Sequence, residues 1–166
     1  CQGDHDTALR HCERGYQASA DVTDASYLYP YLLTGVRAHL ARGDVDAAQT
    51  WSDQVGAVLT VRAIPGTLPA IGHARGLLLL AQGEVAAAYQ ELQAARESWQ
   101  VLRRFWEGTW ARLDLAAAAA RARRRGEASV LADQVRTTAT AAGAAVSGQE
   151  AADGRSRDAS CSRTAS

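Results

Sequence analysis

The stretch AQGEVAAAYQELQAARESWQVL, residues 81–102, combines a glycine, an acidic residue and a regular apolar pattern. Its apolar residues recur at alternating intervals of three and four, which places them on one stripe of an α-helix. The stripe comprises Val85, Ala88, Leu92, Ala95, Trp99 and Leu102. We therefore expect an amphipathic helix in this stretch, with the stripe buried against the rest of the chain.

The glycine and acidic residue that open this helix recur along the chain. Such pairs begin at Gly3, Gly43, Gly83 and Gly126, at intervals of 40, 40 and 43 residues. Glycine suits the left-handed residue that follows a helix, and an acidic residue favours the N-terminus of the next helix. The spacing therefore predicts helical repeats with corners near residues 3, 43, 83 and 126.

Similar stripes follow the earlier corners. They comprise Val45, Ala48, Trp51, Val55 and Val58 after the second corner, and Ala8, Cys12 and Tyr16 after the first. The helices that precede the glycines are expected at about 30–42, 69–82 and 106–125, and the first two begin with proline, which suits a first helical turn. Thr67 is a candidate cap for the second of them, after a loop at 61–69, and a further loop is expected at 20–26. Small residues such as Gly35 and Gly76 would let neighbouring helices approach closely.

Composition supports an all-α fold made of antiparallel helix pairs, an α-solenoid. Of the 166 residues 36 are alanine, and all 18 basic residues are arginine, so strong helix formers dominate. We assign residues 1–144 to one helical-repeat domain. Residues 145–166 are rich in Ser, Ala, Gly, Asp and Arg and contain almost no large apolar side chain, so we expect a disordered tail or linker there.

The charge balance argues against direct binding of DNA or of a membrane by this chain. The 18 arginines are matched by 18 acidic residues, so the formal net charge is zero, whereas binders of nucleic acid carry a basic excess. Apolar runs are far too short to cross a bilayer. Cys1, Cys12 and Cys161 are widely spaced and do not resemble a disulfide framework, which favours a cytoplasmic setting.

Catalytic and metal-binding motifs are missing from the sequence. It contains no phosphate-binding glycine loop, no HExxH and no paired CxxC. Cys1 and His5 have a Cys-x3-His spacing that could supply half of a metal site, but a structural role is favoured, as it is for His39 and His73. We therefore predict no catalytic residue, no metal site and no cofactor.

Aromatic and basic side chains are concentrated in WQVLRRFWEGTWARLDLA, residues 99–116. Trp99, Trp106 and Trp110 are expected mainly to pack in the core. Aromatics beside arginines can also bind a nucleotide or anchor a partner. The candidate binding residues are Arg103, Arg104, Trp106, Trp110 and Arg112. A competing hypothesis makes this cluster the site of an enzyme that uses Glu107 and Asp114.

Four arginines occur within RARRR, residues 121–125, where a helix is expected to end. Cations at a helix C-terminus complement its dipole, so a solvated cap is favoured over a patch for nucleic acid or for an acidic partner.

The segments ARGDVDAAQTW, HARGLLLLAQGEVAAAYQELQAARESW and WEGTWARLDLAAAAARARRRGE resemble the tetratricopeptide-like region of actinobacterial LuxR-type, MalT-like ATPase regulators. The resemblance covers about residues 3–144 and implies a tetratricopeptide-like superhelix. In that family the repeats lie between an ATPase module and a DNA-binding helix-turn-helix, and neither motif occurs in this sequence. Similar repeats occur in bacterial cyclases and other signalling ATPases.

The function that this resemblance implies is a non-catalytic protein-interaction or effector-sensing segment of a transcriptional regulator. Its partners would be a protein, other domains of the same polypeptide or a small-molecule effector. A helical-repeat scaffold from another signalling ATPase or cyclase is the alternative.

Overall fold

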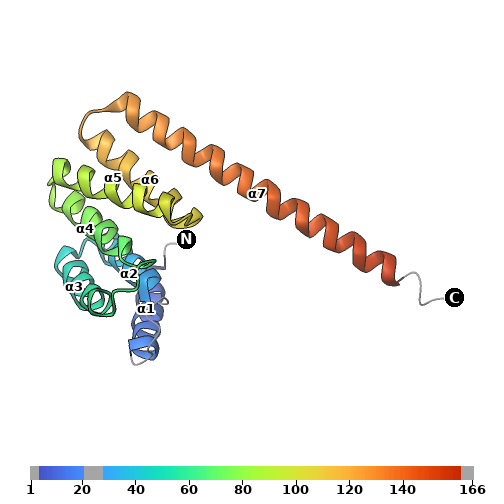
Figure 1. The fold of residues 1–166 in the computed structure, drawn as a ribbon, viewed down its shortest axis with the longest axis horizontal. Helices are drawn as coiled ribbons and strands as arrows, with labels where there is room; N and C mark the ends of the chain where they lie inside the picture. The colour runs from blue at the N-terminus through green and yellow to red at the C-terminus, as the bar shows by residue number, and fades with distance from the viewer. Residues whose placement is uncertain (1–3, 21–27, 162–166) are drawn as a thin grey trace.

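Short turns join helices of similar length along most of the chain (Figure 1). The computed structural model describes residues 4–20 and 28–161, with side chains for 4–19 and 28–143. Every regular element in these residues is an α-helix, which confirms the all-α prediction. The helices are α1 (His5–Ala20), α2 (Leu28–Ala41), α3 (Val45–Arg62), α4 (Pro69–Gln82), α5 (Val85–Val101), α6 (Phe105–Arg121) and α7 (Arg125–Cys161).

Each helix packs on the next one along the chain, and the even-numbered helices also contact one another. α2 contacts α4, and α4 contacts α6, so these three helices form a row. α1 to α6 lie together in one body, whereas α7 packs on α6 and then runs away from that body (Figure 1).

Left-handed backbone recurs every twenty residues. Positive φ angles occur at Gly43, Ala63, Gly83, Arg103 and Arg123. Each of these residues lies within three residues after the end of a helix, where a left-handed residue reverses the chain. Asp44 also caps α3 as expected, because its Oδ1 accepts a hydrogen bond from the N–H of Ala47 at 2.9 Å.

The turn before α7 differs from the sequence prediction. α6 ends at Arg121 instead of continuing to residue 125, and Arg123 takes the left-handed conformation with φ 62°. Gly126 lies within the first turn of α7 and has no positive φ. The turn therefore follows the 40-residue period set by Gly43 and Gly83, and not the glycine.

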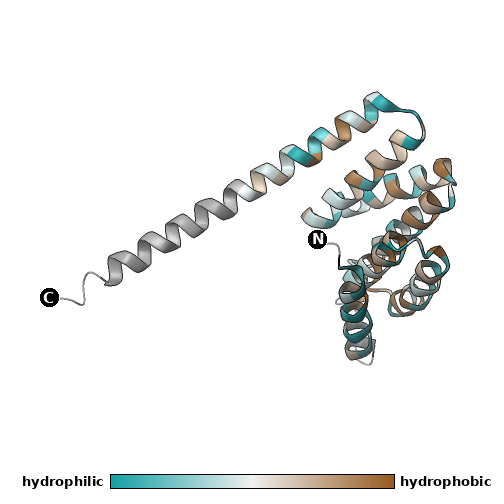
Figure 2. Cartoon of the chain, turned by 180° about the vertical axis from the view of Figure 1, so that it is seen from behind, coloured by the Kyte–Doolittle hydropathy of each residue, from teal (hydrophilic) through white to brown (hydrophobic). Residues whose placement is uncertain are grey.

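The stripe on α5 is buried over most of its length. Leu92 and Trp99 have no exposed surface, Ala88 and Ala95 are buried, and Leu102 is 37% exposed beyond the helix end. Its expected burial was wrong because the chain turns at this residue. Figure 2 shows hydrophobic and hydrophilic residues interspersed along the packed helices.

Gly35 and Gly76 leave room for a large side chain of the neighbouring helix, as expected. A Cβ atom at Gly35 would lie 2.2 Å from Nε1 of Trp51, and one at Gly76 would lie 2.7 Å from Cγ of Leu92. The Trp51 indole N–H, brought close in this way, donates to the carbonyl of Tyr31 at 3.0 Å.

Three further predictions concern the cap at Thr67, the loop at 20–26 and the tail at 145–166. Thr67 does not cap α4, because Leu68 occupies the N-cap and the Thr67 hydroxyl donates to the carbonyl of Ile64 at 2.8 Å. The expected loop at 20–26 lies almost entirely outside the described residues. α7 is helical to Cys161, but side chains beyond Gly143 are outside the described part, so the boundary at 144 and the tail at 145–166 remain predictions.

Replacing Leu92 by alanine should lower the free energy of unfolding by roughly 2–5 kcal/mol, because it removes a fully buried side chain and leaves a cavity against Gly76. Urea denaturation measures this change. Gln90→Ala, at an exposed position of the same helix, is the matched control and should stay within about 0.5 kcal/mol. A loss below about 1 kcal/mol for Leu92→Ala would contradict the buried stripe.

Alanine at Gly126 and at Gly83 should change stability in opposite directions. Gly126→Ala should stabilise the fold by about 0.4–1 kcal/mol, because helical backbone suits alanine, whereas Gly83→Ala should destabilise it by about 1–2 kcal/mol, because φ is 87° there. A Cβ meets no atom within 4 Å at either site, so backbone conformation alone is compared. Thermal unfolding measures both, and destabilisation by Gly126→Ala would mean that Gly126 forms the turn.

Candidate functional site

The aromatic residues of the 99–116 cluster divide between the core and the surface. Trp99 is fully buried, as expected, and its indole N–H donates to Nδ1 of His73 at 3.3 Å. Trp106 and Trp110 are 59% and 42% exposed, so the prediction that they pack in the core is wrong. α6 instead buries small side chains such as Ala111 and Ala118, which bring it close to its neighbours.

Trp110 lies at the edge of a groove between distant parts of the chain. The groove has a volume of about 970 Å³ and is lined by α1, α2, one leucine of α4 and Trp110 of α6. Its walls combine apolar side chains such as Leu40 and Leu77 with the polar side chains of His5, His11 and Arg37. The guanidinium of Arg37 lies 5.4 Å from the ring centroid of Trp110, within the range of a cation–π contact.

A buried polar network lies behind this groove. Asp114 of α6 accepts hydrogen bonds from Arg37 of α2, at 3.0 Å for its Oδ1, and lies 2.7 Å from Nε2 of His73 on α4. Because Trp99 of α5 donates to Nδ1 of His73, Nε2 carries the imidazole hydrogen and donates it to Asp114. The network therefore ties four helices together through one carboxylate.

Hydrogen bonding fixes the ionisation of Asp114. Burial raises the pKa of the Asp114 carboxyl. The hydrogen bonds from His73 and Arg37, together with the charge of Arg37, lower this pKa by a larger amount, so it stays below its ordinary value. The Asp114 carboxylate is consequently an ionised structural partner in the interior.

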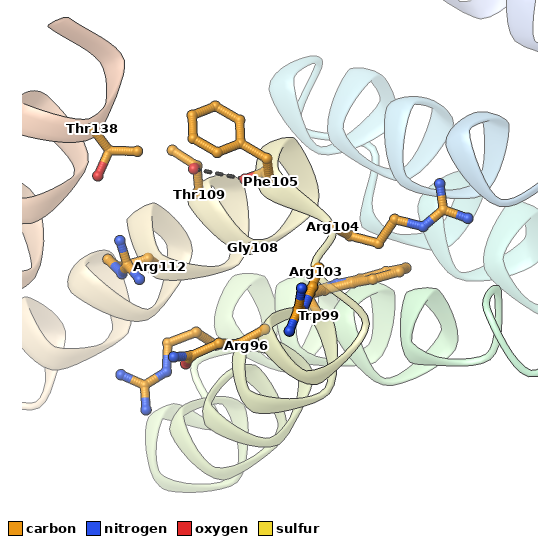
Figure 3. A pocket seen from close by; sticks show the side chains of 10 residues that line it. Arg96, Trp99, Arg103, Arg104, Phe105, Gly108, Thr109, Arg112 and Thr138 are labelled. Atoms are coloured by element: carbon orange, nitrogen blue, oxygen red, sulfur yellow. Dashed lines mark hydrogen bonds between the residues drawn. The ribbon is translucent and has the colours of Figure 1, made fainter. Parts of the chain in front are cut away.

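All three predicted binding arginines line a second hollow, of about 360 Å³, at the junction of α5 and α6. They are Arg103, Arg104 and Arg112, and Arg96 of α5 lines it as well. Figure 3 shows Arg96, Arg103 and Arg112 around the hollow, while Arg104 extends away from it. The Arg104 guanidinium lies 5.7 Å from the ring centroid of Tyr29 on α2.

The predicted cluster is therefore not one site. Trp110 lines the groove, the arginines line the second hollow, and Trp106 lines neither of these two. Trp106 packs edge-on against Phe105, with 4.9 Å between the ring centroids. Sequence reasoning did not find Arg37 or Arg96, because each depends on a helix that only the fold brings to the site.

The two acids of the enzyme hypothesis both have structural partners. Asp114 belongs to the buried network, and Oε1 of Glu107 accepts a hydrogen bond from the Tyr29 hydroxyl at 2.7 Å. Burial raises the pKa of Tyr29, and the bond to Glu107 raises it further.

The arginines of 121–125 have separate roles around the turn. Arg121 donates to the carbonyl of Leu80 near the end of α4 at 2.5 Å. Arg124 lies over the ring of Tyr89, 4.5 Å from its centroid, and 3.7 Å from Glu127. Two of the four arginines in this run are thus engaged by their own fold.

Cysteine and histidine side chains do not form a metal centre in the described part of the chain. Across residues 4–19 and 28–143 no three His, Cys, Asp or Glu side chains are grouped to hold an ion. Cys12 is a buried free thiol whose pKa is raised to about 11 by burial. Cys1 and the side chain of Cys161 lie outside the described residues.

Comparisons with protein-family models, curated proteins and solved structures find no match to this chain. None of the described helices has the length and apolar character required to span a membrane.

Replacing Asp114 by asparagine should lower the free energy of unfolding at pH 7 by roughly 1.5–3 kcal/mol, because charged hydrogen bonds to Arg37 and His73 are lost. The native chain should also lose stability as the pH falls below the unfolded pKa of about 3.9 and through the lower folded pKa of Asp114. Asp114→Asn should make this dependence shallower.

Urea denaturation between pH 7 and pH 2.5 measures both effects. Asp53→Asn, on the exposed side of α3, is the matched control and should retain the native pH dependence. Equal acid sensitivity of the native chain and Asp114→Asn would contradict the role of the buried network.

Proposed function

We propose that this chain is a non-catalytic binding segment, folded as a tetratricopeptide-like superhelix of antiparallel helix pairs. The regular turn spacing and the row formed by α2, α4 and α6 support this architecture. Stacked helix pairs characteristically bind partners on an extended concave surface. The resemblance to LuxR-type regulators further supports a cytoplasmic role in transmitting a signal within such a protein.

The groove is the observation that carries the proposal. A volume of about 970 Å³ is within the upper part of the range of small-molecule sites. Trp110 and Arg37 supply an aromatic and a cationic contact at one edge, a combination that recurs at binding hot spots. The groove would take an effector or a segment of a partner, including another domain of the same polypeptide.

The arrangement of acids favours binding over catalysis. Of the two acids named for an enzyme, Asp114 is tied to Arg37 and His73, and Glu107 to Tyr29. A general acid or base must reach a substrate proton. An ionised carboxylate held on the inner side of the groove wall is better suited to fixing Arg37.

Groove binding can be followed through the indole N–H resonances of the four tryptophans in a nitrogen-15 NMR titration. A panel of nucleotides and metabolites should include a binder that shifts the Trp110 signal. Trp106 lies one helical turn away and does not line the groove, so it is the internal control. Trp110→Ala and Arg37→Gln should each weaken binding about tenfold or more.

Duplex DNA provides the opposing test. Because the chain has no net charge, any binding through the arginines of 121–125 should be weak and should fall steeply as salt rises. Sequence-selective DNA binding at physiological salt would overturn the proposed function. Turnover of a panel compound that is abolished by Glu107→Gln would favour the enzyme.

A further inference from the structure

The hollow at the α5–α6 junction has an unusual balance of charge. Arginines make up four of its ten lining residues, and none of the ten is acidic. The Arg96 guanidinium lies 3.5 Å from Glu97, but Arg103, Arg104 and Arg112 form no ion pair with any described residue. The Nε atoms of Arg96 and Arg112 are buried without a hydrogen-bond partner.

These guanidinium groups come from three successive pieces of the fold. Arg96 lies in the last two turns of α5, Arg103 occupies the left-handed turn and Arg112 lies in the second turn of α6. The antiparallel packing of α5 on α6 brings them to one hollow (Figure 3). Like charges in this arrangement repel, and buried donors without partners cost stability.

An anion in the hollow would relieve the repulsion between these charges. Guanidinium groups donate paired hydrogen bonds to phosphate and carboxylate oxygens. Donors that approach from several sides suit the tetrahedral oxygens of a phosphoryl group better than the two coplanar oxygens of a carboxylate. The hydroxyls of Thr109 and Thr138 already donate to helix carbonyls, at 2.8 Å and 2.7 Å, so the guanidinium groups remain the principal donors.

We propose that Arg96, Arg103 and Arg112 form a binding site for a compact, multiply charged phosphate compound of the pyrophosphate class. The volume of about 360 Å³ is near the lower limit of small-molecule sites, so the ligand is small. Phe105, which is 47% exposed, supplies an apolar wall, and the buried Trp99 lies behind it. The site is separate from the groove and does not depend on the function proposed for the groove.

The test is isothermal titration of the full chain with inorganic pyrophosphate, with ionic strength held constant by sodium chloride. Pyrophosphate should bind at one site and raise the melting temperature more than sulfate does. Citrate, which carries comparable charge on carboxylates, should bind at least about tenfold more weakly. Equal effects of pyrophosphate and sulfate would show general screening and overturn the proposal, and stronger citrate binding would overturn the phosphate class.

Two variants separate binding from folding. Arg112→Gln should weaken pyrophosphate binding at least about tenfold, because it removes charged hydrogen bonds. Arg103→Gly should also weaken it while preserving or raising stability, because glycine suits the φ of 54° at this turn. Loss of binding in that variant therefore cannot be attributed to misfolding.

Arg14→Gln is the matched control, since it removes one exposed arginine from α1, away from the hollow. It should bind pyrophosphate as the native chain does. Retention of binding by Arg103→Gly and Arg112→Gln, or equal loss in Arg14→Gln, would overturn the assignment of the site. Because the Trp110 indole signal reports the groove, it should stay unshifted, and a pyrophosphate shift confined to Trp110 would likewise overturn the assignment.

Discussion

The helices from α2 to α6 each end in a reversal of the chain, and the left-handed residue that makes this reversal recurs at twenty-residue intervals. Three of the five positions hold alanine or arginine, for which such backbone costs about 1–2 kcal/mol. The packing of the following helix must outweigh that cost. The constant interval keeps α2, α4 and α6 in register, so that His73 on α4 and Asp114 on α6 can meet from positions 41 residues apart.

The sequence predicted the parts of the fold that depend on local rules. Leu92 and Trp99 could be assigned to the core because a stripe of constant spacing has one face, and α4 was predicted from residue 69 to residue 82 as observed. The glycine pattern predicts the last corner at Gly126, whereas the chain turns at Arg123. The required φ is instead imposed on Arg123 by the packing of α6 and α7.

The sequence alone could not show which face of α6 is buried and which is exposed, because this helix has two apolar faces. One contains Ala111, Leu115 and Ala118 and is buried, and the other contains Trp106, Trp110 and Leu113 and is exposed. Hydropathy alone favours burying the tryptophans, but α5 and α4 approach closely only against the small residues. The arginine hollow and the groove wall depend on that choice, so their complete residue sets required the three-dimensional arrangement.

The 40-residue period explains why the second face is exposed. Ala70 and His73 on α4 are buried, and they correspond to the exposed Trp110 and Leu113 on α6. α6 packs against α4 near these positions, as the His73–Asp114 contact shows, whereas no described helix occupies the equivalent place beside α6. The face of α6 that contains Trp110 and Leu113 is therefore exposed because α6 is the last described helix of the row. The groove beside Trp110 also involves α1 and α2.

The groove and the arginine hollow are connected by the buried network. Arg37 lines the groove, Trp99 lines the hollow, and Asp114 and His73 link them through hydrogen bonds. Both carboxylate oxygens, both imidazole nitrogens and the indole N–H are engaged. Nε of Arg37 is buried without a hydrogen-bond partner, but the paired atoms of Asp114, His73 and Trp99 favour one arrangement of the network. This chain of contacts therefore holds the two hollows in a fixed relation. An interior built in this way explains how a domain rich in alanine can position a few large side chains accurately.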